Sequence, residues 1–262
     1  MIKHLILFLI VGLLSQTLSR SAEPIRKPLK DVSFDLKNLQ SQQTHKYKWV
    51  SVVQKGTKTV SNDYALFVAS SKFAKDKLQL HDTITLVPAY NGTIFDRKMN
   101  YPKSNLLAPE QITLDISGPA NTVRQLSYEK GEATIIEFSG RTNIQRWIFD
   151  DGILTFNMLL RLTPLLPAQI GNVYTFHKYA EPFLFRIRES EKKEDPFTLT
   201  CEASETVILG NKSHECFRFR LELKAEEVKT DIWIGKNNLV VKFVDTLPED
   251  AGANFLQATL QE

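Results

Sequence analysis

The sequence has few of the residues and motifs that usually carry out catalysis. Its 262 residues include only two cysteines and five histidines. It contains no Gly-x-Ser-x-Gly nucleophile turn, no His-Glu-x-x-His zinc helix and no glycine-rich phosphate loop. The loose pair His214 and Cys216 offers two ligands, which do not make a zinc site. We therefore predict no catalytic residue, no metal and no cofactor, and we expect a protein that is not an enzyme.

Long apolar runs are also missing. The run Leu5–Leu14 has ten residues, whereas a membrane-spanning helix needs about 20. Lys3 precedes the run and small residues follow it, which is the order typical of a secretion signal. We predict a cleavable signal peptide over residues 1–21, cut after Ser21, with cleavage after Ser19 and a retained anchor as the alternatives. The mature protein is then periplasmic or secreted and has no membrane span.

A concentration of basic charge is the third thing the sequence lacks. The formal net charge of the whole chain is +3. Lys3 and Arg20 lie in the predicted signal peptide, so the mature chain is close to +1. Local charge clusters mix both signs, as in residues 191–195. Proteins that bind nucleic acid concentrate Lys and Arg on one face. We therefore exclude nucleic acid as a partner.

What the chain does have is apolar residues at every second position. In Phe217–Leu223, four apolar side chains alternate with Arg218, Arg220 and Glu222, as in a half-buried antiparallel strand. Similar patterns predict strands over Trp49–Val53, Tyr64–Val68, Leu78–Val87, Ile112–Ile116, Thr134–Phe138, Val173–Tyr179, Phe183–Arg188, Asp231–Ile234, Leu239–Val244 and Phe255–Leu260. So many short strands, without regular helix-length patterns between them, favour a mainly β fold.

The fold we predict is a curved antiparallel sheet that forms a β-roll or barrel-like domain. Residues 22–46 are polar and contain several prolines. They are expected to form an extended N-terminal segment, with room for an edge strand. Residues 47–262 are expected to form a single antiparallel β domain.

One segment breaks the two-residue period. Thr155 can cap a helix, and Pro164 forces the helix to end near Thr163. This predicts one short central apolar helix over about residues 155–163, buried on most sides. It either plugs the open side of the sheet or lines a pocket for a lipid-like or apolar ligand. The pocket residues would be Phe156, Leu159, Leu160 and Leu162.

Four arginines alternate with apolar residues on two predicted strands. They are Arg186, Arg188, Arg218 and Arg220. If the two strands are neighbours, these guanidinium groups form a cluster that can hold an anionic head group. The interpretation we favour is a solvent-facing surface on which arginine pairs with Glu189 or Glu222 across strands.

The two cysteines pose an open question about a disulfide. Export to an oxidising compartment favours a bond between Cys201 and Cys216. A hairpin that turns at Gly210–Asn211 instead sets Cys216 opposite Glu205 and Cys201 opposite Arg220. The cysteines would then be about 13 Å apart along the strands. A disulfide needs Cα atoms within about 7 Å. Both outcomes stay open.

Three stretches together carry a resemblance to a known family. They are His81–Pro88, the apolar helix with Leu165–Pro167 and Tyr174–Phe176, and the run from Glu205–Gly210 through Cys216–Phe219 to Asp231–Ile234 and Leu239–Phe243. Over roughly its C-terminal two thirds, the chain resembles exported bacterial proteins of a domain-of-unknown-function family, the DUF-3108-like group. The resemblance implies a secreted or periplasmic β-roll or barrel-like fold, related in spirit to envelope lipoprotein carriers. It brings no catalytic residue with it.

Three functions are consistent with these features. The first is a non-enzymatic envelope protein that binds an apolar or amphiphilic ligand. The second is a protein–protein interaction or scaffold module of the cell envelope. The third is an unrecognised hydrolase, for which the sequence offers no candidate residues. The sequence does not determine the identity of a ligand or partner, or the oligomeric state.

Overall fold

The computed structural model of the protein describes a defined part of the chain. The described residues are 23–34, 36, 42–118, 123–129, 132–138, 142–148, 154–180, 187–189, 196–223, 228–247 and 253–261. The predicted signal peptide and Arg186 lie outside them. Among the helices within these ranges, none combines the length and the apolar character that a membrane crossing requires.

The described strands form one large sheet and one small sheet. The large sheet contains β1 Arg26–Pro28, β2 Gln42–Lys55, β3 Lys58–Ala74, β4 Lys77–Leu86, β5 Ile94–Pro102, β6 Gln111–Ser117, β7 Val123–Glu129, β8 Glu132–Phe138, β9 Thr142–Ile148, β11 Val173–Phe176, β14 Phe197–Leu209, β15 Lys212–Leu223, β16 Val228–Gly235, β17 Val240–Thr246 and β18 Phe255–Gln261. The small sheet contains β10 Leu154–Thr155, β12 Lys178–Ala180 and β13 Ile187–Glu189. The helices are η1 Leu29–Asp31, η3 Pro88–Tyr90, α2 Phe156–Leu162 and η4 Thr163–Leu165.

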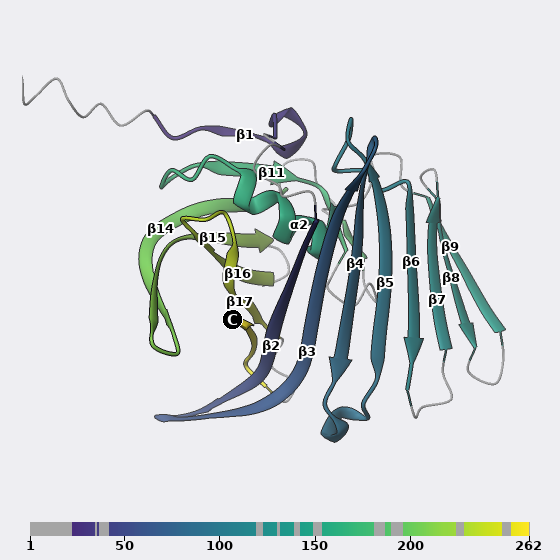
Figure 1. Cartoon of the computed structure of the whole chain (residues 1–262), viewed down its shortest axis with the longest axis horizontal. Helices are drawn as coiled ribbons and strands as arrows, with labels where there is room; N and C mark the ends of the chain where they lie inside the picture. The colour runs from purple at the N-terminus through teal and green to yellow at the C-terminus, as the bar shows by residue number, and fades with distance from the viewer. Residues whose placement is uncertain are drawn as a thin grey trace, which may run out of the picture.

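The large sheet is continuous and curved. Its strand order is β1-β11-β14-β15-β16-β17-β18-β2-β3-β4-β5-β6-β7-β8-β9. Its strand pairs are antiparallel except β1 with β11, which pair in parallel at one edge. The sheet curls so that β14–β17 and β2–β4 lie on opposite sides of α2, while β6–β9 continue away from the helix (Figure 1). The predicted fold class is confirmed: a mainly β, barrel-like curved sheet around one short central helix.

Alternation of side chains explains why the helix lies on one face of this sheet. From Tyr47 to Trp49 on β2 and from Ala65 to Ser71 on β3 the odd-numbered residues are buried, for example Trp49 and Phe67, and the even-numbered ones are exposed or half-buried. The ring of Phe156 on α2 lies 5.1 Å from that of Phe243 on β17, which lies 5.4 Å from that of Trp49. Aromatic rings from both sides of the curl therefore meet the helix, and this cluster closes the inner core. We call the face that contacts α2 the inner face and the opposite face the outer face.

Candidate functional site

The short helix begins and ends where its sequence predicts. The Thr155 side chain accepts a hydrogen bond from the backbone N–H of Met158 at 3.2 Å, which caps the helix. After Leu162 the backbone tightens into η4, whose second residue is Pro164. The predicted helix over about 155–163 therefore differs from α2 by one residue at each end. The cap satisfies one of the backbone donors in the first turn of α2.

The four residues predicted to line a ligand pocket are core residues. The exposed fractions of Phe156, Leu159, Leu160 and Leu162 are 1%, 0%, 3% and 1%. Beside Leu160 lies a cleft of about 30 Å³ between α2, β2 and the turn before β17. That is room for about one water molecule. A ligand therefore reaches these four side chains only if α2 moves, and the pocket stays a prediction.

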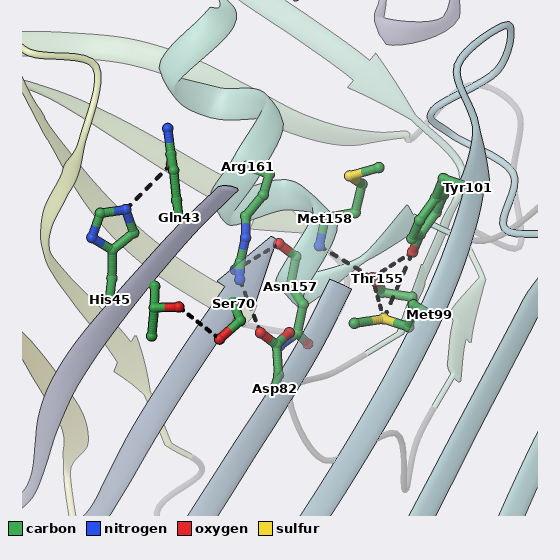
Figure 2. A network of polar contacts seen from close by, with 11 residues as sticks. Gln43, His45, Ser70, Asp82, Met99, Tyr101, Thr155, Asn157, Met158 and Arg161 are labelled. Carbon is green, nitrogen blue, oxygen red and sulfur yellow. Dashed lines mark hydrogen bonds and ion pairs between the residues drawn. The ribbon is translucent and has the colours of Figure 1, made fainter. Parts of the chain in front are cut away.

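A buried polar network anchors α2 to the inner face of β4 (Figure 2). Asp82 is fully buried, and its carboxylate accepts hydrogen bonds from the Asn157 amide and from Arg161 Nη2, the latter at 2.8 Å. Arg161 also donates through Nη1 to the backbone oxygen of Asn157 at 3.3 Å. The Arg161 side chain is 11% exposed, so the ion pair is shielded from water. A buried carboxylate with these charge-assisted partners is held in one position.

A second polar contact lies at the N-cap of the helix (Figure 2). The hydroxyls of Tyr101 and Thr155 are 2.9 Å apart, and both lie near the sulfur of Met99. Burial raises the pKa of the Tyr101 phenol well above its ordinary value. The phenol therefore stays protonated and acts as a neutral hydrogen-bonding group that ties β5 to the helix cap.

The rim of the cleft carries further polar groups. The His45 ring nitrogen lies 3.3 Å from the Gln43 side-chain oxygen (Figure 2). Burial lowers the pKa of His45, and the nearby Arg161 charge lowers it further. Tyr47 donates to the backbone oxygen of Val240 at 3.2 Å, and burial raises its pKa to about 12. These groups are neutral near pH 7, so Arg161 supplies the positive charge among the cleft-lining residues described here.

The inner network was not anticipated from the sequence, although one signal was present. Asn157 and Arg161 lie four residues apart, and therefore on one face, of an otherwise apolar helix. Polar groups buried in such a helix need partners. The partner is Asp82, 75 residues before Asn157, and only strand register reveals it. Among the described residues, no group of three His, Cys, Asp or Glu side chains is placed to hold a metal ion.

The outer face of the same strands carries a wider hollow. It has a volume of about 490 Å³ and lies across one end of β2–β5. Its lining residues are Gln42, Thr44, Ser70, Ser71, Lys72, Gln79, Leu80, His81, Lys98 and Asn100. We call this hollow the outer groove. Its volume falls within the range of about 300 to 1,000 Å³ that is typical of ligand sites.

Comparisons with known proteins leave the family open. No protein-family model matches the chain, and no curated protein matches it. Among solved structures, the chain is similar to a beta-barrel-like protein of domain of unknown function DUF1849 from Brucella abortus. The TM-score is 0.44 and the sequence identity 7%, over 85% of this chain and 98% of that one. Membership of the DUF-3108-like group stays a prediction.

The described arginines of the predicted anion cluster, Arg188, Arg218 and Arg220, lie on strands of different sheets. Arg188 belongs to β13, which pairs with β12 in the small sheet, and Arg186 is outside the described residues. Arg220 on β15 makes two 2.9 Å bonds to Asp231. Both Arg220 and Arg218 lie 3.3 Å from a Glu202 carboxylate oxygen. The two β15 arginines therefore pair with carboxylates across strands, as in the solvent-facing interpretation, but their described partners are Glu202, Glu205 and Asp231, whereas Glu222 pairs with Lys229.

The two cysteines are free and lie in different apolar clusters. The predicted register of Cys216 opposite Glu205 is confirmed. Cys201 lies opposite Phe219 instead of Arg220, because a bulge between Cys201 and Ala203 shifts the register by one residue. Cys201 is in the main core, and Cys216 packs in a smaller cluster with Trp233. In the structure both are thiols, and burial raises the pKa of Cys201 to about 11.

Proposed function

We propose that the protein is an exported, non-catalytic binding module of the cell envelope, and that it holds its ligand or partner in the outer groove. The observation that carries this proposal is the contrast in volume between the two faces of β2–β5. The outer groove measures about 490 Å³, and the cleft beside α2 about 30 Å³. A binding site needs an open concave surface, which the outer groove provides.

The arrangement of titratable groups supports binding over catalysis. On the inner face, Asp82 is fully engaged by Asn157 and Arg161. On the outer face, the His81 ring nitrogen lies 2.5 Å from an Asp96 carboxylate oxygen. A hydrolase needs a nucleophile within reach of its general base. Within the described residues, neither pair has a Ser, Thr or Cys side chain hydrogen-bonded to it. Export is supported by the signal-like residues 1–21 of the sequence.

Native mass spectrometry of the protein purified from its own envelope tests the proposal. The groove variant is Gln42→Ala/Lys72→Ala/Gln79→Ala, which removes one groove residue from each of β2, β3 and β4. The matched control is Lys48→Ala/Leu66→Ala/Thr85→Ala. These three residues are also in register on the outer face of the same strands, but outside the groove.

We expect an added mass, either a small molecule or a stoichiometric protein, on the wild type and on the control but not on the groove variant. A small added mass identifies a ligand-binding module, and a protein identifies an interaction module. An added mass that persists on the groove variant, or a wild-type protein with no added mass, would overturn the proposal.

Binding of an amphiphilic ligand beside α2 is a second candidate function. One observation favours it: the cleft brings Arg161 and His45 together with apolar Leu160 and Val240. In this function an anionic head group competes with Asp82 for Arg161, and the apolar tail displaces α2. The test is titration of delipidated protein with a fluorescent fatty acid. We expect saturable binding that Arg161→Gln weakens, and no saturable binding by the wild type would exclude this function.

A further inference from the structure

The polar side chains of the outer groove are arranged in rows that cross the strands. Thr44 is in register with Ser70, Ser70 with His81, and His81 with Lys98. A second row runs parallel to the first, two residues along each strand. It consists of Gln42, Lys72, Gln79 and Asn100. Neighbouring strands lie about 4.8 Å apart, so each row offers a polar group at that spacing. An extended chain lying across the strands therefore meets polar groups at regular intervals.

The polar groups in these rows both donate and accept hydrogen bonds. Amides and hydroxyls have both capacities, as do the hydroxyl groups of a sugar. Part of this capacity is used internally: Thr44 bonds Ser70 at 3.1 Å, and Asn100 donates to Gln111 at 3.2 Å. Gln42, Lys72 and Gln79 are exposed and make no side-chain hydrogen bond to the rest of the described chain. Their polar groups are available to a ligand.

The charge of the outer groove is positive but sparse. Its ammonium groups belong to Lys72 and Lys98. An Asp96 oxygen lies 3.8 Å from Lys98, and Asp96 also contacts His81, so part of this charge is compensated. Lys72 has no carboxylate within ion-pair distance among the described residues. Such a groove suits a ligand that combines carboxylates with many hydroxyl groups better than one that binds through charge alone.

The composition of the lining also disfavours two other polymers. No Phe, Tyr or Trp side chain lines the groove, whereas proteins that bind single-stranded nucleic acid stack successive bases on such rings. The one large apolar residue of the lining, Leu80, is 2% exposed. Protein partners are usually anchored by aromatic or Arg side chains in desolvated pockets, and this lining offers no such pocket.

We infer that the ligand of the outer groove is a glycan that carries carboxylates; this inference rests on the proposed function of the groove. The two rows bind the sugar hydroxyls through amides and hydroxyls, and Lys72 and Lys98 bind carboxylates. The sugar chain lies across β2–β5, perpendicular to the strands.

The test is isothermal titration of the purified protein with a defined probe, an oligogalacturonate. A neutral glucose oligomer and a polyglutamate peptide are the comparison ligands. We expect the oligogalacturonate to bind more tightly than either. Losing one hydrogen bond to a charged group costs about 1.5 kcal/mol, or about tenfold in Kd. We therefore expect about tenfold weaker binding by Lys72→Ala, and no detectable binding by Gln42→Ala/Lys72→Ala/Gln79→Ala.

The control Lys48→Ala/Leu66→Ala/Thr85→Ala should bind the oligogalacturonate as the wild type does. Equal binding of polyglutamate would mean that the groove recognises charge alone. Equal binding of the neutral glucose oligomer would mean that the ligand needs no carboxylate. Either result overturns the inference, as does the absence of binding to the oligogalacturonate. If the envelope-purified protein carries a groove-dependent mass that is not a glycan, the inference fails while the proposed function stands.

Discussion

The two faces of β4 place polar residues in opposite situations. Asp82 on the inner face is fully buried and bonded to two partners on α2. His81, one residue earlier, lies on the outer face, is exposed, and belongs to the outer groove. The inner polar groups are few, and Asp82, Asn157 and Arg161 bond one another. The outer ones are many and some remain open. Polar residues that stabilise the fold are thus separated by one sequence position from those available for binding.

The largest expected effect comes from removing the inner carboxylate. Asp82→Ala leaves the Arg161 guanidinium and the Asn157 amide without their acceptor in a dry site, which should lower the free energy of unfolding by about 3 kcal/mol. The matched control is Asp96→Ala on the outer face of β5, whose carboxylate is partly exposed. It should cost less than about 1 kcal/mol. Urea unfolding followed by tryptophan fluorescence measures both. Equal losses would mean that the two faces do not differ in this way.

The helix cap should give the next largest effect. Thr155→Val keeps the shape of the side chain but removes the hydroxyl that caps α2 and that bonds Tyr101. Losing a cap and leaving a buried phenol without its partner together cost about 2 kcal/mol. The control Thr85→Val changes a partly exposed outer-face residue of β4. An unfolding midpoint for Thr155→Val that matches the control would show that this contact does not stabilise the helix.

The pH dependence contributed by His45 should be smaller. Its pKa in the folded protein is lowered from 6.5, so the unfolded chain binds the proton more readily. The stability associated with neutral His45 is therefore present above pH 6.5, and it decreases as the pH falls below that value. His45→Gln should lose less stability on acidification than the wild type. The measurement is urea unfolding on both sides of pH 6.5, and parallel losses in the two proteins would contradict the prediction.

The smallest effect on stability is expected in the outer groove. Gln79→Ala changes an exposed side chain with no bond to the rest of the described chain, so the free energy of unfolding should change by no more than about 0.5 kcal/mol. Thermal unfolding checks this. A loss comparable to that of Asp82→Ala would show that the groove residues support the fold, and it would remove the distinction between the two faces.

Local patterns predicted much of this architecture. The alternation in Phe217–Leu223 falls within β15, and the Gly210–Asn211 turn joins β14 to β15 in the expected place. Thr155 and Pro164 bracket the helix as expected. In each case the signal lies within a few residues, because turns, caps and alternation are local effects.

Features that depend on distant residues were not predicted. The segment Ile94–Pro102 was not recognised as a strand, because Arg97 occupies an inward position and interrupts the apolar alternation. Arg97 lies opposite Asp82 on β4, so its burial depends on register between strands. The outer groove is similar: its polar residues come from four strands, and only their pairing shows that they form rows. A predicted strand over Val173–Tyr179 is in fact two, β11 and β12, in different sheets.

The position of β18 has a consequence for how the chain reaches this structure. This strand, the last in sequence, pairs with β17 on one side and with β2, near the start, on the other. Until β18 pairs, no backbone strand pairing within the described residues joins β17 to β2, and the edges of both strands stay open. Strand pairs between residues so far apart in the sequence form slowly. Open edges also invite pairing with other chains. Because synthesis begins at the N-terminus, the curl is completed only after β18 has been made. Loss of β18 would leave the edges of β2 and β17 exposed to aggregation.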